Sequence, residues 1–322
     1  MAKAAELHKQ FDLKARLRDG SGPIDVLSTI RDVGIMVLFR PLEGLLGAYV
    51  PTPSAAGMLV TTQRDHHVQR FTAAHELGHH VCGHSAPSLD VSVGFVARGE
   101  KDGYDAQEVE ADAFAAEFLL PKWLITAHAR RQHWSLPDLS RPDVVYQLSL
   151  RLAASYSATC WALLAADYVP LKVAQQLAKL PPRLSKQRAM PDFQPDNWYG
   201  DVWLMSERDA GVQIVGSPDD YLVFNLEEHA AGGYEWGFDA LNEAPLEVRH
   251  DQRKHDVPLV YGAPVTRRVV LQGNAISQTV VRLDERRPWE ADENALKSLE
   301  LRLALLGKEP VGMVRPERFI SA

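Results

Sequence analysis

Apolar and polar positions follow different periods in the two halves of the chain. From about Ile24 to Leu164 the apolar residues recur mainly with a helical period, interrupted by short β-like runs between glycines and prolines. The segments expected to be strands or helices are, in order, Ile24–Val33 (amphipathic), Ile35–Phe39, Leu45–Val50 and Met58–Thr61 (β-like), then helices near His67–Val81, Ala106–Leu120, Val144–Ala154 and Ala158–Ala166. The first half is therefore predicted to be an α+β domain.

The helical period disappears after a proline-rich stretch. Leu180–Trp198 is charged, weakly apolar and broken by prolines, which is typical of a linker. Beyond it lie short β-rich runs separated by turn residues: Asp201–Ser206, Val212–Val215, Tyr221–Asn225, Tyr234–Phe238, Arg267–Leu271, Gln278–Leu283 and Leu299–Leu305. This pattern predicts an antiparallel sandwich. We expect residues 1–179 to form one domain, 180–198 a linker and 199–322 a second, all-β domain, with the two domains folding separately.

Composition and charge narrow the class of protein. The 322 residues are 46% apolar and 24% charged, which fits a globular chain with room for two cores. The net charge of −7 disfavours a general binder of nucleic-acid backbones. Two cysteines, Cys82 and Cys160, are too few for a disulfide scaffold or a thiolate zinc site. No apolar run resembles a signal peptide or a membrane span, so we expect a cytoplasmic protein without membrane contact.

The segment Phe71–His79, FTAAHELGH, contains the pattern H-E-x-x-H on a predicted helix. Residues four apart share one helix face, so His75 and His79 can both bind one tetrahedral metal ion. Glu76 is placed to accept a proton from a water molecule at that ion. Taken alone, the pattern also fits a surface helix with two solvated histidines.

A catalytic zinc ion needs a third protein ligand and an open fourth position. The metzincin spacing fails, because Cys82 and Ser85 occupy the positions at which that pattern has Gly and His. We expect His80 and His84 to be helix-face or loop residues, since His84 is one position out of register.

The next predicted helix offers the third ligand. Glu108 and Asp112 lie one turn apart, so Glu108 can bind the ion while Asp112 accepts a hydrogen bond from a ligand imidazole. Glu110 points roughly 160° away from Glu108 and is not expected to bind. The alternative is a solvated acidic face. Imidazole and carboxylate ligands suit Zn²⁺, the expected cofactor, and also suit manganese or iron.

Two segments, RFTAAHELGHH and EVEADAFAAEFLLP, resemble the ImmA/IrrE metallopeptidase family over about residues 20–170. Members typically show F-T-x-A-H-E-L-G-H and then E-x-x-A-[ND]-x-F-A-x-x-L-L-x-P. The resemblance implies a zincin-like domain with His75, His79 and Glu108 as zinc ligands and Glu76 as general base. It also implies a substrate class, intracellular helix-turn-helix transcriptional repressors. The departures are small: Asp112 replaces the commoner Asn, and His80 replaces an apolar residue.

A helix pair follows Pro121, as in many members of that family. Val144–Leu164 has the shape of a helix-turn-helix, with Ser155 or Ser157 able to cap the second helix. No basic residue lies between Ser155 and Tyr168, although a DNA-recognition helix needs Lys or Arg. We therefore expect this pair to pack on the peptidase domain or to dock a repressor, and direct contact with nucleic acid is not expected.

The β-rich region resembles the chagasin-like inhibitors of papain-type cysteine peptidases. Gly233–Trp236 matches the end of the loop N-P-T-T-G-[YF]-x-W, Gly262–Thr266 lies where a Gly-rich loop is expected, and Arg287–Trp289 matches the loop R-P-W. The resemblance implies an immunoglobulin-like sandwich with three loops at one end. His229–Gly232 replaces N-P-T-T, and Pro264-Val265 replaces the paired glycines, which weakens the case for inhibition. The predicted partner-binding residues are Tyr234, Trp236, Arg287, Pro288 and Trp289; the two tryptophans also fit the core or rim of a sandwich.

These features predict a zinc metallopeptidase that recognises protein through its C-terminal sandwich, and the ImmA/IrrE resemblance implies that its substrate is a helix-turn-helix repressor. Two alternatives stay open. The chain can be a regulatory protein that binds a repressor or a peptidase with little catalysis, or an inhibitor that binds papain-type peptidases near Trp236 and Trp289. Cleavage that EDTA abolishes separates the enzyme from both.

Overall fold

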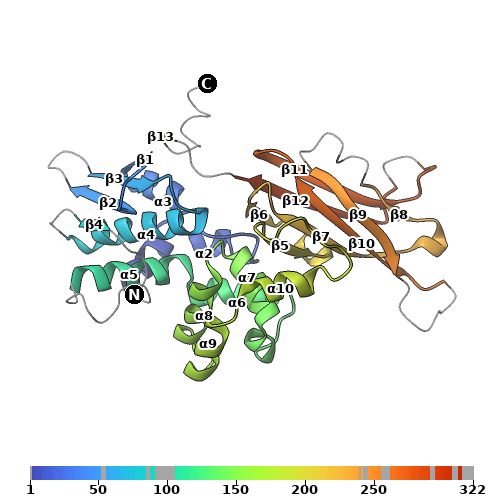
Figure 1. Ribbon diagram of the computed structural model, residues 1–322, viewed down its shortest axis with the longest axis horizontal. Coiled ribbons are helices and arrows are strands. Elements are labelled where there is room, and N and C mark those ends of the chain that lie inside the picture. Colours follow the sequence, from blue (N-terminus) through green and yellow to red (C-terminus); the bar gives the residue numbers. More distant parts are fainter. Residues whose placement is uncertain are drawn as a thin grey trace. The chain divides into compact units, whose positions relative to one another are not determined.

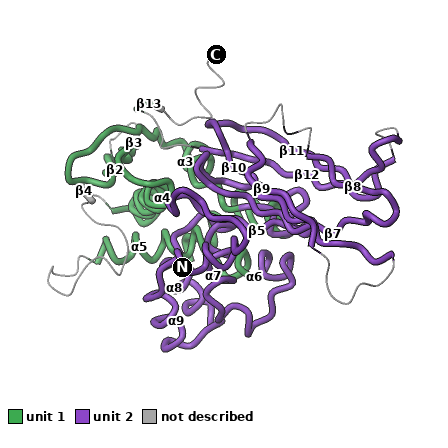
Figure 2. Tube along the Cα trace, turned by 45° about the vertical axis from the view of Figure 1, so that its right-hand side comes forward, with its two compact units in different colours: residues 1–18, 23–125, 308–322 green, residues 19–22, 126–307 purple. Residues whose placement is uncertain are grey.

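A computed structural model describes residues 2–51, 56–84, 88–90, 106–238, 241, 246–254, 262–290, 294–306 and 311–313 (Figure 1). These residues fall into two compact units, which are coloured separately in Figure 2. Unit 1 comprises Met1–Arg18, Pro23–Ile125 and Lys308–Ala322. Unit 2 comprises Asp19–Gly22 and Thr126–Gly307. The helices α7 to α10 therefore group with the C-terminal sheets, whereas the sequence places them in the N-terminal domain and the linker.

Unit 1 is an α+β arrangement built on a mixed sheet. Its helices are α1 (Ala2–Gln10), α2 (Leu13–Arg16), α3 (Val26–Asp32), α4 (His66–Cys82) and α5 (Ala106–Leu119). Its strands are β1 (Met36–Arg40), β2 (Gly47–Pro51), β3 (Ala56–Thr61), β4 (Ser88–Asp90) and β13 (Gly312–Met313), in the order β13-β1-β3-β2-β4. Only the β1–β3 pairing is parallel among them. Helix α4 packs against β2, β3 and α5, so it lies between the sheet and α5 (Figure 1).

Helix α4 has a well-defined C-terminal end. Gly83 follows it with φ 74°, the left-handed conformation that a glycine adopts without a Cβ penalty. The Gly83 N–H donates to the His80 carbonyl and the His84 N–H to the His79 carbonyl, at 3.1 and 3.0 Å. These two bonds form a Schellman motif, which turns the chain back over the last turn of the helix.

The N-terminal part of unit 2 is helical, and two of its helices, α7 and α10, contact strand β5. The helices are α7 (Pro142–Arg151), α8 (Tyr156–Ala165), α9 (Leu171–Ala178) and α10 (Pro182–Ala189), and α6 (Lys122–Arg131) begins in unit 1. Ser155 caps α8 as predicted, because its hydroxyl accepts the Ala158 N–H at 3.1 Å. Helix α7 contacts β5: the Gln147 side chain donates to the Val202 carbonyl and accepts from the Leu204 N–H. A chain cut after residue 179 would expose this face of α7.

Two four-stranded sheets form the rest of unit 2. One has the order β5-β7-β10-β9 and the other β6-β12-β11-β8. The strands are β5 (Val202–Met205), β6 (Gln213–Gly216), β7 (Tyr221–Glu228), β8 (Glu235–Trp236), β9 (Leu246–Lys254), β10 (Val265–Gly273), β11 (Ser277–Arg286) and β12 (Lys297–Leu305). The β5–β7 and β6–β12 pairings are parallel, so the sandwich is mixed rather than wholly antiparallel. Alternate residues Leu299, Leu301 and Leu303 are buried, as one face of a sandwich strand requires.

The predicted linker contains ordered structure. Helix α10 lies inside it, and Ala189 and Met190 form a hydrophobic cluster with β5, β7 and β10. The Lys186 ammonium donates to the carbonyls of Trp198, Tyr199 and Gly200, which holds the following segment against the helix. The charged composition of this stretch therefore reflects local hydrogen bonding as well as exposure to solvent.

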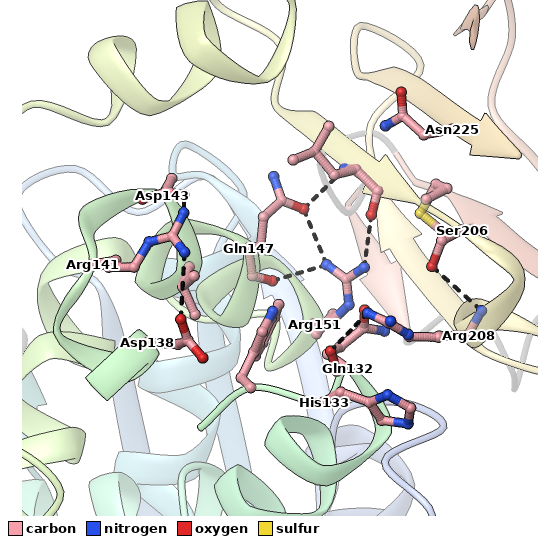
Figure 3. A pocket seen from close by; sticks show the side chains of 14 residues that line it. Gln132, His133, Asp138, Arg141, Asp143, Gln147, Arg151, Ser206, Arg208 and Asn225 are labelled. Carbon is pink, nitrogen blue, oxygen red and sulfur yellow. Dashed lines mark hydrogen bonds and ion pairs between the residues drawn. The ribbon is translucent and has the colours of Figure 1, made fainter. Parts of the chain in front are cut away.

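A buried ion pair joins α7 to the sandwich within unit 2. Arg151 and Asp209 are 2.9 Å apart and both side chains are buried. Arg151 also donates to the Gln147 and Leu204 carbonyls and to the Gln147 amide oxygen (Figure 3). Asp209 accepts from Gln132. A polar pocket of about 300 Å³ opens beside this cluster. The pair fixes the helical segment on β5.

Arg151→Ala should destabilise unit 2 by about 3–5 kcal/mol, because it leaves the buried Asp209 carboxylate without its cation. Urea unfolding of the full-length protein, followed by tryptophan fluorescence, measures this change. Arg141→Ala is the matched control, since that arginine is 58% exposed and pairs with Asp143 at the surface. Similar losses for the two variants would contradict the structural role of the buried pair.

Candidate metal centre

The two histidines of the H-E-x-x-H pattern lie in the C-terminal half of α4, with His79 in its last turn, and both are buried, as is Glu76. One helical turn separates His75 from His79, and their ring centroids are 4.7 Å apart. Their Nε2 atoms face each other at 2.9 Å. The helix thus presents two imidazole nitrogens at one point of its surface, as the spacing predicts.

Helix α5 brings a carboxylate to the same point. Glu108, in the first turn of α5, places Oε2 3.3 Å from His75 Nε2 and Oε1 3.4 Å from His79 Nε2. Glu108 remains partly exposed, so one side of the cluster faces outward. The structure therefore brings together the three predicted ligands, His75, His79 and Glu108.

These three residues fit a zinc ion. A tetrahedral zinc with nitrogen and oxygen ligands at about 2.0–2.2 Å separates those atoms by about 3.3 Å. The observed separations of 2.9, 3.3 and 3.4 Å lie close to that value. Two imidazoles and one carboxylate are also a donor set that catalytic zinc sites use, with a fourth position left for water or substrate.

Asp112 contacts the candidate ligand His75 on the side of the ring away from the cluster. Asp112 Oδ1 lies 2.8 Å from His75 Nδ1, and both side chains are buried. A carboxylate at Nδ1 holds the proton there, which leaves the Nε2 lone pair directed at the cluster. The predicted contact between Asp112 and a ligand imidazole is therefore present.

Glycines allow the close packing that this site needs. A Cβ on Gly78 would lie 3.1 Å from both the Ala111 Cα and the Phe114 side chain, so the glycine lets α4 approach α5. A Cβ on Gly47 would lie 2.7 Å from Glu76 Oε1 and even closer to the Thr72 methyl. Strand β2 can therefore pass directly beside Glu76. An isolated glycine within a β-like run is the sequence signal for such an approach.

Two further histidines lie around the end of α4. His80 bonds to the Tyr49 hydroxyl at 2.9 Å, and burial lowers the pKa of this histidine. His84 is buried, with its Nδ1 2.8 Å from Nδ1 of His79 and its Nε2 3.3 Å from Glu110. Glu110 lies outside the zinc-ligand cluster, and hydrogen bonds from His84 and Cys82 lower its pKa. His84 therefore contacts the candidate ligand His79, a contact that its position out of helical register does not predict.

The three C-terminal loops lie at one end of the sandwich. Val265 pairs with Glu228, and Glu285 pairs with Trp236, so the loops that follow β7, precede β10 and follow β11 share an edge. Two buried carboxylates fix the base of this edge. Glu285 accepts the His229 N–H at 2.6 Å, and Glu228 accepts from Arg267 at 3.0 Å.

Tyr234, Arg287 and Trp289 form a surface cluster at these loops. The Arg287 guanidinium lies 4.6 Å from the Tyr234 ring centroid and donates to the Gly232 carbonyl. A Cβ on Gly233 would lie 2.6 Å from the Trp289 ring, so the indole covers that glycine. Trp289 nevertheless remains 72% exposed. Pro288 lies between Arg287 and Trp289 in the chain.

The prediction that Trp236 is a partner-binding residue is wrong, because its side chain is buried. It is 1% exposed, and its indole N–H donates to the Glu227 carbonyl at 2.9 Å. The side chain alternates with its neighbours along β8, and this alternation directs it into the sandwich. Trp236 therefore belongs to the core, where it supports the loops without reaching a partner.

A family model matches part of the chain. The model of the IrrE N-terminal-like domain, Peptidase_M78, matches residues 30–164. This family comprises zinc metallopeptidases, and the matched range contains His75, Glu76, His79 and Glu108. The resemblance of the N-terminal region to the ImmA/IrrE family is confirmed by this match.

Solved structures are similar to a smaller share of the chain. The cysteine protease inhibitor EhICP2 from Entamoeba histolytica is 20% identical, with a TM-score of 0.30, and the match covers 34% of this chain and 100% of that chain. Amebosin is 18% identical, with a TM-score of 0.28, and the match covers 32% of this chain and 96% of that chain. The sandwich described above rests on its own strand pairings, and no function follows from these scores. No curated protein matches the chain. Among the described residues, no helix has the length and apolar character of a membrane span.

Glu108→Ala should weaken zinc binding strongly, because it removes one of the three protein ligands. Glu110→Ala is the matched comparison: it removes a carboxylate from the same helix at a position outside the zinc-ligand cluster, and the variant should lose much less zinc affinity than Glu108→Ala does. Elemental analysis after dialysis against metal-free buffer measures both. Loss of zinc from the Glu110 variant together with full retention in the Glu108 variant would show that the ligand is wrongly identified.

Proposed function

We propose that this chain is a zinc-dependent endopeptidase whose substrate is a helix-turn-helix transcriptional repressor, since residues 30–164 match the model of the IrrE N-terminal-like domain. The convergence of His75, His79 and Glu108 on one point, with Glu76 next to His75 along α4, carries the proposal of catalysis. The substrate class rests on the resemblance to ImmA/IrrE peptidases.

The reaction assigned to this site is hydrolysis of a peptide bond. A bound zinc supplies a Lewis acid that polarises the scissile carbonyl and lowers the pKa of water. Glu76 accepts the proton of the attacking water and then delivers it to the nitrogen of the leaving amine as the C–N bond breaks. Asp112 keeps the proton of His75 on Nδ1. Gly47 leaves the space in which the Glu76 carboxylate lies.

The packing around Glu76 supports its role as the base. The carboxylate is buried beside β2, where a general base is shielded from bulk water. Glutamine has nearly the same shape and can fill this space, but its amide cannot accept the proton of the attacking water. The Glu76→Gln variant therefore separates proton transfer from metal binding.

Glu76→Gln should retain zinc and lose cleavage by about 100-fold or more, because general-base catalysis commonly contributes that much. The assay incubates the purified full-length protein with purified helix-turn-helix repressors from the organism that encodes it and follows fragments by gel and mass spectrometry. EDTA should stop cleavage by the wild type, and added zinc should restore it. Cleavage by Glu76→Gln at more than a tenth of the wild-type rate would contradict the role of Glu76.

We further propose that the C-terminal sandwich recognises the protein substrate. Exposed aromatic and arginine side chains on a fixed framework are typical anchors of protein interfaces. Tyr234, Arg287 and Trp289 supply such anchors, and buried Glu228 and Glu285 hold the loops that carry them. Since the cluster lies outside the matched peptidase range, it should affect binding of the substrate without changing the chemistry.

Trp289→Ala should reduce kcat/KM for the repressor by about tenfold or more, mainly through KM, and leave hydrolysis of an unstructured peptide unchanged. Tyr199→Ala is the matched control, because that tyrosine is an exposed aromatic residue of unit 2 away from the three loops. The recognition proposal fails if Trp289→Ala cleaves the repressor as well as the wild type does. An equal loss on both substrates would instead indicate a general effect on the enzyme.

A further inference from the structure

His84, the residue after the Gly83 cap of α4, lies against His79, one of the proposed zinc ligands. Gly83 adopts φ 74°, and the Schellman bonds that follow bring the His84 backbone to the carbonyl of His79. In this motif the residue after the glycine commonly contacts the residue five positions earlier through apolar side chains. Here the two side chains are imidazoles, with ring centroids 4.9 Å apart.

The two rings are close enough for a hydrogen bond between nitrogens. His79 Nδ1 and His84 Nδ1 are 2.8 Å apart, and both rings are buried. On its other side, His84 Nε2 lies 3.3 Å from Glu110 Oε2. The three side chains form a row that begins at the metal centre and ends at the partly exposed carboxylate of Glu110.

Only one arrangement of protons satisfies this row when a metal is bound. His79 offers its Nε2 to the cluster, and a nitrogen that binds a metal carries no proton. The proton of neutral His79 is therefore on Nδ1 and is donated to His84 Nδ1. His84 must then carry its own proton on Nε2, from which it donates to Glu110.

We propose that His84 is the positioning residue for His79 and that Glu110 selects the tautomer that His84 needs for this task. The inference rests on the proposed metal centre. The two ligand histidines are then held by different partners: His75 by the carboxylate of Asp112 directly, and His79 by an imidazole with a carboxylate behind it. Hydrogen bonds of this kind fix the orientation of a ligand ring and raise its basicity.

The same proton arrangement opposes a second metal site. Cys82, His84 and Glu110 also place ligand atoms within 4.8 Å of one another. A neutral imidazole has one lone pair, and His84 uses it to accept from His79. Burial also raises the pKa of the Cys82 thiol, which opposes the thiolate that a metal would require. We therefore expect one zinc ion per chain rather than two, and the experiment below measures this number.

The experiment measures zinc affinity of the full-length protein by competition with a chromophoric chelator. His84→Ala should bind zinc about 10–100-fold more weakly than the wild type, the range usual for partners of ligand residues. His84→Asn, whose side-chain oxygen can accept from His79, should recover part of the loss. His80→Ala is the matched control, since it removes the neighbouring imidazole, which bonds to Tyr49. Far-UV circular dichroism verifies that each variant is folded.

A second measurement reports the tautomers directly. Long-range ¹H–¹⁵N spectra of the zinc-loaded protein should show His79 protonated on Nδ1 and His84 protonated on Nε2. A folded His84→Ala variant with wild-type zinc affinity, a His84 protonated on Nδ1, or a second zinc that Cys82→Ser removes would each overturn the inference. Absence of zinc binding by the wild type, or its insensitivity to His75→Ala, would instead refute the metal centre itself.

Discussion

The close approach of α4 and α5 is the constraint on which the metal centre depends. Gly78 has no side chain, and a Cβ at that position would lie 3.1 Å from Ala111 on the facing helix. At this separation, Glu108 and Asp112 of α5 reach both sides of the His75 ring. Because the imidazoles lie on α4 and the carboxylates on α5, a wider spacing between the two helices would move these groups apart. The glycine between the two motif histidines thus determines whether the third ligand can reach the site.

The centre is built mainly from buried polar groups, whose desolvation requires compensation. His75, Glu76, His79 and Asp112 are all buried in unit 1, and the hydrogen bonds of His75 with Asp112 and of His79 with His84 supply part of this compensation. The ligand nitrogens and carboxylate oxygens already lie near the separations that a tetrahedral ion requires. A site prepared in this way needs little rearrangement on binding, which favours both affinity and a fixed position for Glu76.

The parts of this site that repeat with the helical period are predictable from the sequence, and the parts that depend on chain reversal are not. His75, His79, Glu108 and Asp112 follow from spacings of four along two helices. His84 lies beyond Gly83, so its contact with His79 depends on a cap rather than on a period.

Similar reasons explain the differences in unit 2. Strand β9 is mostly exposed and is stabilised by charged pairs such as Arg267 with Asp251, so its apolar pattern is weak. Helix α10 has a charged sequence but packs its last residues under the sheet. Trp236 is buried, but the loop motif that contains it does not indicate whether the side chain points into the sandwich or toward solvent. In each case the tertiary partner decides what the local sequence leaves open.

The central claim is that zinc binds to two imidazoles and one carboxylate in this chain. X-ray absorption at the zinc edge measures those ligands directly in the loaded, full-length protein. We predict nitrogen and oxygen neighbours at about 2.0–2.2 Å, the multiple-scattering signature of two histidines, and no sulfur neighbour at about 2.3 Å. A sulfur neighbour would contradict it, because a thiolate such as that of Cys82 would then bind the ion in place of the proposed set.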